Sequence, residues 1–393
     1  MEVRHKRDQK NSITNALGLT QYDERLAGVV ESPKAKDQIS ALLDLIDLQQ
    51  SGAEDSPTGV ALLLASPASE AIGALETLRN AVAADVPVAV LRLDAVSNSW
   101  TPVERPDFDL ATEDPHYKGW PKLLGARFKA PSLVEQLLAA AQTPKLRVYP
   151  QLSAVGEWSL RLEGLQVGRV RSNNSGFLDV GRLGKVTTPG QPGNQSTERK
   201  TWLEVHRRGR VDFDEKDLVT AAAKVQAFAQ AWHAKAGGKA NEHALESRIL
   251  RGDVPVGIDG RRLELIKPDP GVNWGSQFPT KWGPGGRARY LDALLRDPAE
   301  QDVPWAVEMK VGLGGEGQYY RHAVAQAVLY RHFIRNAADL RFWFEHYDLD
   351  ATKCRAAVVV PEFKTAHWET RLTRLCELFG VRLATVPEAA TLP

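Results

Sequence analysis

The chain has 393 residues, of which 43% are hydrophobic and 25% are charged, as is typical of soluble globular proteins. This length predicts two or three domains, and the two cysteines exclude a disulfide scaffold and a cysteine-rich zinc site. The sequence indicates neither a signal peptide nor a membrane span, so we expect a cytoplasmic protein without a membrane partner.

The net charge of +1 conceals an uneven distribution along the chain. Residues 31–140 include 16 acidic and 9 basic residues, whereas residues 145–210 include 12 basic and 5 acidic ones. The second segment therefore either meets a polyanion or presents a solvated basic face without a partner.

The N-terminal region, residues 1–143, alternates between helices and strands. The pattern predicts helices at 32–50, 69–85 and 132–142, buried strands at 59–66 and 86–96, and a loop at 100–121. A strand, a helix and a second strand in this order predict a parallel pair. The region is therefore an α/β domain, and its role stays open between a sensor, homo-oligomerisation and docking of a partner protein.

The middle region, residues 144–236, shows the alternation and glycine turns of antiparallel strands. We expect strands at 145–153, 157–171, 177–185 and 201–213, a polar loop at 187–200 and a helix at 215–235. Gly237 and Gly238 then mark a domain boundary.

The third region, residues 237–393, is predicted to be an α/β domain with the element order α-βββ-α-β-α-β. Helices are expected at 241–252, 318–337 and 367–380. Strands are expected within 261–266, in a hairpin formed by 273–282 and 287–297, and at 304–312, 354–362 and 381–387.

The strand PWAVEMKVG, residues 304–312, contains two charges in an otherwise apolar run. Since side chains alternate between faces, Glu308 and Lys310 share one face and Val307 and Met309 share the other. Such charges either protect an edge strand from aggregation or belong to a site. The preceding hairpin strand favours a site, because it should bring Asp292 to the same end of the sheet.

Two carboxylates and one ammonium are suited to phosphoryl chemistry. The oxygens of Asp292 and Glu308 are hard ligands of the kind that Mg²⁺ prefers. The ammonium of Lys310 can orient an attacking water and offset negative charge in the transition state. The alternative is a surface acid beside an ordinary ion pair.

These residues and this element order resemble the PD-(D/E)XK nuclease superfamily, which has the restriction-endonuclease-like fold. YLDALL (290–295) is similar to its acidic strand motif, VEMK (307–310) to its E-x-K motif, and QAVLY (326–330) to the Q-x-x-x-Y helix motif of its RecB-like branch. The resemblance covers about residues 237–387. It departs at Leu291, where a proline can precede the acid in the family.

The resemblance implies a metal-dependent nuclease that hydrolyses phosphodiester bonds in DNA, with a role in phage defence or DNA repair. Mg²⁺ or Mn²⁺ would be bound by Asp292, by Glu308 and by the backbone carbonyl of Met309. The leading helix, ESRIL, would contribute Glu246 near the metal, unless this acid is a charge on the helix surface.

The resemblance also implies supporting roles around the metal. Lys310 would position the attacking water, while Gln326 and Tyr330 would support the site and contact the substrate, unless they are ordinary residues of a helix. The competing hypothesis is a catalytically inactive nucleic-acid-binding or complex-forming protein that keeps the nuclease fold.

The basic middle region supplies candidates for nucleic-acid binding. Arg207, Arg208 and Arg210 would contact phosphates, and Trp158 and Trp202 would stack on bases. An antiparallel scaffold that joins two domains is the alternative.

A remote alternative is a dinucleotide-binding turn. Gly312, Gly314 and Gly317 form G-x-G-x-x-G between a predicted strand and a helix, and Glu345 could bind a ribose. However, the strand before the glycines includes two charges, whereas a buried parallel strand should be apolar. Glu345 also lies 28 residues beyond Gly317, farther than the usual interval of about 20.

Overall fold

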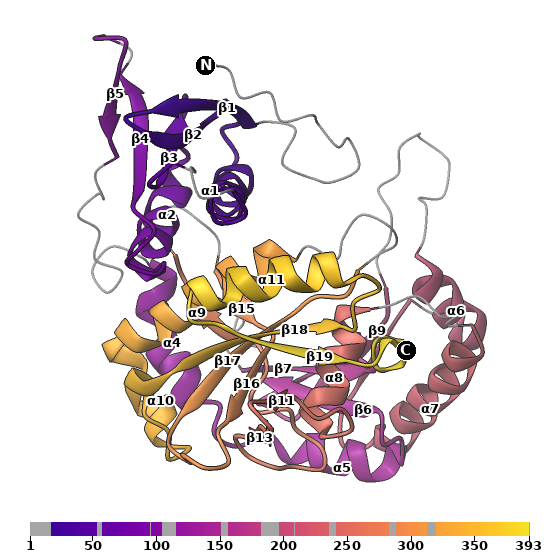
Figure 1. The fold of residues 1–393 in the computed structure, drawn as a ribbon. Coiled ribbons are helices and arrows are strands. Elements are labelled where there is room, and N and C mark those ends of the chain that lie inside the picture. The colour runs from indigo at the N-terminus through magenta and orange to yellow at the C-terminus, as the bar shows by residue number, and fades with distance from the viewer. Residues whose placement is uncertain are drawn as a thin grey trace.

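The computed structural model describes residues 17–52, 57–94, 96–103, 115–150, 156–181, 196–207, 209–235, 241–282, 288–312 and 320–392. Within these ranges the chain forms a mixed α/β structure with three five-stranded sheets and two small hairpins (Figure 1). The predicted α/β class is therefore confirmed. Each of the three predicted regions contains one large sheet, while the boundaries between the regions stay predictions.

The N-terminal sheet has the strand order β1-β2-β3-β4-β5. Strands β2, β3 and β4 run parallel, as predicted for the central pair, because helical connections cross over between them. The sequence pattern predicts neither the hairpin β1–β2 nor the edge strand β5. The elements are β1 (Leu17–Tyr22), β2 (Arg25–Val30), α1 (Ala35–Gln50), β3 (Val60–Leu64), α2 (Ser69–Ala81), β4 (Val88–Asp94) and β5 (Ser99–Pro102).

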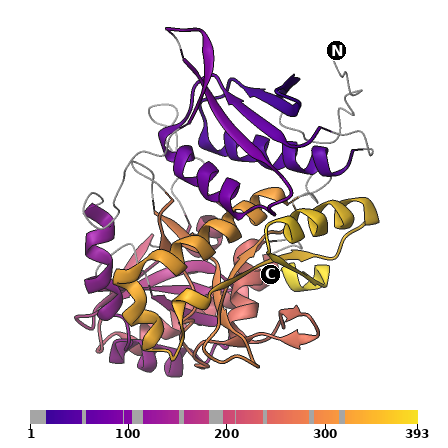
Figure 2. The same cartoon turned by 60° about the vertical axis from the view of Figure 1, so that its left-hand side comes forward.

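Helices α1 and α2 pack against two C-terminal helices, α9 (Arg321–Asn336) and α11 (Ala366–Leu378) (Figure 2). One hydrophobic core contains buried side chains of all four helices. At its edge, Asp47 of α1 is 1% exposed and forms ion pairs with Arg371 and Arg374 of α11, at 2.6 and 2.5 Å. The N-terminal region is thus joined to the C-terminal region through a core and buried charges.

The middle sheet has the strand order β10-β9-β8-β7-β6 and is antiparallel throughout, as predicted. Helices α4, α5 and α7 share its hydrophobic core. The elements are α4 (Pro115–Gly125), α5 (Ser132–Ala141), β6 (Leu146–Pro150), β7 (Glu157–Leu162), β8 (Leu165–Arg171), β9 (Gly176–Asp179), α6 (Thr197–His206), β10 (Arg210–Phe213) and α7 (Leu218–Lys235).

The segment 201–213, predicted to be one strand, is instead divided between α6 and β10. Ser196 caps the helix by accepting a hydrogen bond of 3.2 Å from the Arg199 amide. Trp202 is buried against Phe228 of α7, with ring centroids 5.6 Å apart. The cap and this packing favour a helix where the alternation of polar and apolar residues indicates a strand.

The segment 100–121, predicted to be a loop, contains part of β5 and the start of α4, and residues 104–114 lie outside the described ranges. Tyr117 and Trp120 of α4 are buried and pack edge-on against Phe333 of α9. These aromatic contacts give the helix a tertiary anchor that local composition does not reveal.

The C-terminal sheet has the strand order β13-β16-β17-β18-β19. β13, β16 and β17 are antiparallel, whereas β17, β18 and β19 are parallel. The elements are α8 (Glu242–Arg251), β11 (Gly257–Ile258), β12 (Arg261–Arg262), β13 (Glu264–Leu265), β14 (Phe278–Thr280), β15 (Arg289–Leu291), β16 (Ala293–Arg296), β17 (Pro304–Met309), α9, α10 (Arg341–Glu345), β18 (Arg355–Pro361), α11 and β19 (Arg382–Val386), with short 3₁₀ turns at Ala338–Leu340, Ala351–Lys353 and Glu388–Thr391.

Helices cover both faces of this sheet. Val358 and Val360 of β18 share a core with α9 and α11, whereas Ala357 and Val359 share the opposite core with α8. The predicted hairpin is present as β14 paired with β15, just before β16. Within the described ranges, every helix is too short or too polar to cross a membrane.

Candidate active site

Strand β17, which contains Glu308, is the central strand of the C-terminal sheet and pairs with β16 and β18. Glu308 itself is only 1% exposed. Val307 and Met309 lie in the core beneath α8, and Ala306 lies in the core on the other face, as the predicted alternation requires. An edge strand has a free side, so protection of an edge does not explain these charges.

Asp292 lies between β15 and β16, next to Glu308. The register pairs Ala293, the first residue of β16, with Val307 of β17, so its continuation by one residue brings Asp292 beside Glu308. Asp292 Oδ2 accepts a hydrogen bond of 2.8 Å from the Met309 amide. The structure thus brings the two acids together at one end of the sheet, while their catalytic role stays a prediction.

The ammonium of Lys310 lies among oxygen atoms of the same site. Its Nζ donates hydrogen bonds to Glu308 Oε1 at 2.6 Å and to the Met309 carbonyl at 2.9 Å. It also lies 3.4 Å from Oε2 of Glu242, on helix α8. The lysine side chain is 23% exposed, so solvent reaches this end of the cluster.

The two acids hold their protons unusually tightly. Burial raises the pKa of Asp292 to about 6, with Lys310 opposing the shift and Glu246 adding to it. Burial and the charge of Asp292 raise the pKa of Glu308 well above its usual value. The surroundings therefore stabilise two ionised carboxylates poorly, a condition that a bound cation would relieve.

Glu246 of α8 is 2% exposed and well supplied with partners. Its carboxylate accepts hydrogen bonds from Ser276 Oγ at 2.7 Å and Gln277 Nε2 at 3.3 Å, and it lies 3.9 Å from Arg161 of β7. Burial alone would raise its pKa, but His243, Arg161 and Ser276 together lower it. Glu246, predicted to lie near the metal, therefore connects α8 to the segment before β14. The α8 acid that contacts Lys310 is Glu242.

Gln326 and Tyr330 lie one turn apart on α9 and contact each other. Gln326 Nε2 donates to the Tyr330 hydroxyl at 3.3 Å, and that hydroxyl donates to the Tyr290 carbonyl at 3.3 Å. Burial raises the pKa of Tyr330, and the charges of Glu308 and Asp292 raise it further. The Q-x-x-x-Y residues therefore lie beside the acids and connect α9 to β15.

The donor set is suited to a hard divalent cation. Glu308 Oε2 is buried and accepts no hydrogen bond from the described part of the chain. The other Glu308 oxygen and the Met309 carbonyl already face the cationic Lys310 ammonium. No group of three or more His, Cys, Asp or Glu side chains in the described ranges converges on one metal position. The residues thus suit Mg²⁺ with two carboxylates and retained water, rather than an all-protein cage.

The two predicted stacking residues lie in the core of the middle region. Trp158 is 1% exposed and packs edge-on against Trp274 at 5.7 Å, and Trp202 is fully buried. Stacking on a base requires an accessible ring face. The prediction that these tryptophans bind nucleic acid is therefore wrong.

The three predicted phosphate-binding arginines differ from one another. Arg207 is exposed at the C-terminal end of α6. Arg210 is exposed too, but donates to Asp212 Oδ1 at 2.7 Å. Arg208 lies outside the described ranges. Among the described arginines of this set, only Arg207 presents its charge without a carboxylate partner.

Much of the basic excess in the middle region is used inside the structure. Several of its arginines pair with acids or donate to buried acceptors. They are Arg147 with Asn273, Arg161 with Glu246, Arg169 with Glu157, and Arg199 with Asp179. The charge balance of this segment therefore does not measure a nucleic-acid surface.

A pocket of about 500 Å³ opens beside Lys310 and Gln326. Its lining includes four cationic or imidazole side chains that the motifs do not indicate, namely Lys36, Lys281, Arg289 and His322. They come from α1, the β14–β15 hairpin and α9, which only the tertiary fold brings together. No local sequence signal could have grouped them.

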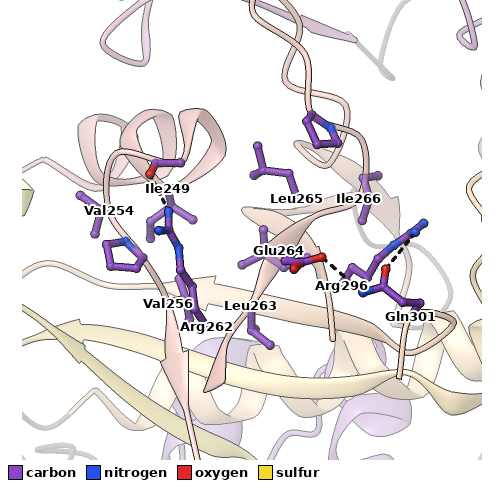
Figure 3. A pocket seen from close by; sticks show the side chains of 14 residues that line it. Ile249, Val254, Val256, Arg262, Leu263, Glu264, Leu265, Ile266, Arg296 and Gln301 are labelled. Atoms are coloured by element: carbon purple, nitrogen blue, oxygen red, sulfur yellow. Dashed lines mark hydrogen bonds between the residues drawn. The ribbon is translucent and has the colours of Figure 1, made fainter. Parts of the chain in front are cut away.

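A second pocket, of about 560 Å³, lies between the end of α8 and strands β12, β13 and β16 (Figure 3). Its polar side chains bind one another: Gln301 donates to Glu264 at 3.3 Å, Arg296 donates to Gln301 at 3.4 Å, and Arg262 donates to the Gly252 carbonyl at 2.8 Å. None of the predicted site residues lines it. This pocket is therefore not the candidate active site.

The glycine motif of the dinucleotide alternative falls mostly outside the described ranges, which include Gly312 but not residues 313–319. Strand β17 runs antiparallel to β16, whereas a dinucleotide-binding strand has parallel neighbours. Glu345 is exposed at the end of α10. β17 does run parallel to β18 on its other side, so the described fold provides one of the two parallel neighbours that this alternative requires.

Comparison with known proteins adds no assignment. No model of a protein family matches the sequence, and a search of curated proteins also found no match. Functional inference therefore depends on the geometry of the site.

Proposed function

We propose that the protein is a metal-dependent nuclease that hydrolyses phosphodiester bonds in DNA, and that its C-terminal region is a PD-(D/E)XK domain. The main support is the placement of Asp292 beside Glu308, with Lys310 bonded to the latter, at the end of a central strand. The order of α8, β13, β16, β17, α9, β18, α11 and β19 also supports the proposal, since it is the order that the resemblance implies.

Asp292, Glu308 and the Met309 carbonyl would hold Mg²⁺ or Mn²⁺. When bound, the ion would offset negative charge on the phosphate and promote ionisation of the attacking water. Because the pKa values of both acids are raised, they would release protons when the ion binds. Metal affinity should therefore rise with pH.

Lys310 would exchange its contacts with Glu308 and Met309 for contacts with the attacking water and the phosphate. There its positive charge would stabilise the transition state more than the bound substrate. Tyr330 and Gln326 would hold α9 against β15 and keep the acids in position.

The test is cleavage of linear duplex, circular duplex and single-stranded DNA by purified protein with Mg²⁺, Mn²⁺ or EDTA. We expect metal-dependent cleavage, abolished in Asp292→Asn and reduced roughly 10²–10³-fold in Lys310→Ala. Lys353→Ala is the matched control, since this exposed lysine pairs with Asp302 at the opposite end of the strands.

Two results would count against the proposal. DNA binding without cleavage of any substrate would support the catalytically inactive alternative instead. Cleavage that survives both Asp292→Asn and Lys310→Ala would place the chemistry outside this site.

A further inference from the structure

The pocket beside Lys310 lies between regions that are far apart in the sequence. Helices α1 and α2 of the N-terminal region form part of its wall, and α8, the β14–β15 hairpin, β17 and α9 form the rest. Lys310 and Gln326 of the candidate active site line it directly. Any substrate that enters through this pocket would therefore pass the N-terminal region before it reaches the acids.

The lining of the pocket has an excess of positive charge. Four cationic side chains face two acids: Lys36, Lys281, Arg289 and Lys310 against Glu70 and Glu242. Lys36 and Arg289 are exposed, and the Arg289 guanidinium lies 5.3 Å from the Trp282 ring. Lys310 is already paired with Glu308, so the exposed cations Lys36 and Arg289 are the ones that favour a ligand with phosphate groups in this concave site.

The wall that contains Lys36 is held in a fixed place against α9. Ser40 Oγ of α1 lies 2.7 Å from the Lys36 carbonyl and 2.7 Å from Nε2 of His322 on α9, within hydrogen-bond distance of both. Arg321 pairs with buried Asp44 of α1 at 2.9 Å. These contacts between the two regions hold the turn of α1 that contains Lys36 beside α9 and the pocket.

The size of the pocket limits its occupant. A pocket of about 500 Å³ is small beside a DNA duplex, whose major groove alone is about 12 Å wide. A duplex would therefore remain at the mouth. An unpaired strand, with its backbone turned toward the cations, would fit.

We propose that this pocket binds an unpaired DNA strand on its way to the active site, and that Lys36 of the N-terminal region contacts one of its backbone phosphates. The identity of the ligand as DNA rests on the proposed function. The N-terminal region then serves as one wall of the substrate path.

The test is metal-free binding of a fluorescein-labelled single strand of about 20 nucleotides, titrated with salt by anisotropy. Losing one phosphate contact should lower the slope of log K against log salt by about 0.7, and weaken binding about fivefold at 0.1 M salt. We expect this change in Lys36→Ala and wild-type binding in Lys36→Arg. Lys34→Ala should also bind like wild type, because Lys34 is exposed and lies outside the pocket lining.

An unchanged affinity and salt slope in Lys36→Ala would overturn the inference, as would an equal loss for single-stranded and duplex DNA of the same sequence. Because the assay contains no metal and measures no cleavage, its outcome is separate from that of the nuclease test. Absence of cleavage refutes the nuclease, whereas unchanged binding in Lys36→Ala refutes the pocket.

Discussion

Replacing Asp292 with Asn should stabilise the metal-free protein at neutral pH. The folded carboxyl has a pKa of about 6 against an ordinary 3.8, so the native state holds its proton more tightly than the unfolded chain does. Stability is therefore lost as pH rises between these values, and the loss is complete above pH 6. At about 1.4 kcal/mol per pKa unit, the two-unit shift corresponds to at most about 3 kcal/mol. Asn avoids this cost and can still accept the Met309 amide hydrogen bond.

The assay is urea unfolding of wild-type and Asp292→Asn protein in EDTA, from pH 4 to pH 8. We expect the variant to be more stable at pH 8, with the difference disappearing near pH 4. Asp297→Asn is a control of opposite sign, because amides of Ala299 and Glu300 and the Trp305 indole outweigh burial and lower the pKa of Asp297. Added Mg²⁺ should stabilise wild type, by about 2.7 kcal/mol at 100 times Kd, and the variant much less. A variant less stable than wild type at pH 8 without metal would refute this account of the buried charge.

Three further predictions concern catalysis, the middle region and the contact between regions. Lys310→Ala should cleave roughly 10²–10³-fold more slowly in single-turnover assays yet bind DNA with near wild-type affinity, and equal losses of both would contradict a transition-state role. Trp202→Ala should lower the free energy of unfolding by about 3–5 kcal/mol, because it truncates a core side chain. Arg207→Ala should leave the free energy of unfolding unchanged, because Arg207 is exposed. If Arg207 contacts a phosphate, the slope of log K against log salt for duplex DNA should fall by about 0.9 in this variant. Asp47→Asn should destabilise the contact with α11 by about 3–5 kcal/mol in urea unfolding, since it leaves Arg371 without its buried partner, and an unchanged midpoint would mean that the pair is dispensable.

Local patterns predicted the elements whose burial is evident in the sequence itself. The apolar run of β3 is buried throughout, and the alternation in β17 correctly separates Glu308 from Val307 and Met309. Prediction failed where a tertiary contact decided the conformation. The segment around Trp202 alternates like a strand, but its cap and the packing of the indole against α7 make it a helix.

The candidate site was predictable to the extent that it follows from strand register. If β16 and β17 pair as antiparallel neighbours, Asp292 must lie near Glu308, because residues opposite each other in paired strands share a face. The orientation of Glu246 could not be predicted from strand register, since its partners Ser276 and Arg161 come from other segments. A motif fixes which residues can meet, whereas their hydrogen-bond partners depend on the whole fold.

The charge count of a segment did not predict a nucleic-acid surface, because the partners of each charge depend on the whole fold. The buried charges of α1 are a better guide to a contact. A surplus of arginines in residues 145–210 indicates nucleic acid only if those side chains face solvent, and many of them pair internally. In α1, by contrast, Asp44 and Asp47 lie within a run of buried residues. A charge on a buried helix face requires a partner of opposite sign. That pattern predicts docking against a basic surface, and α9 and α11 provide it through Arg321 and Arg371. The same docking brings Lys36 to the pocket beside the acids, so the buried acids of α1 are the sequence feature that links the N-terminal region to the candidate site.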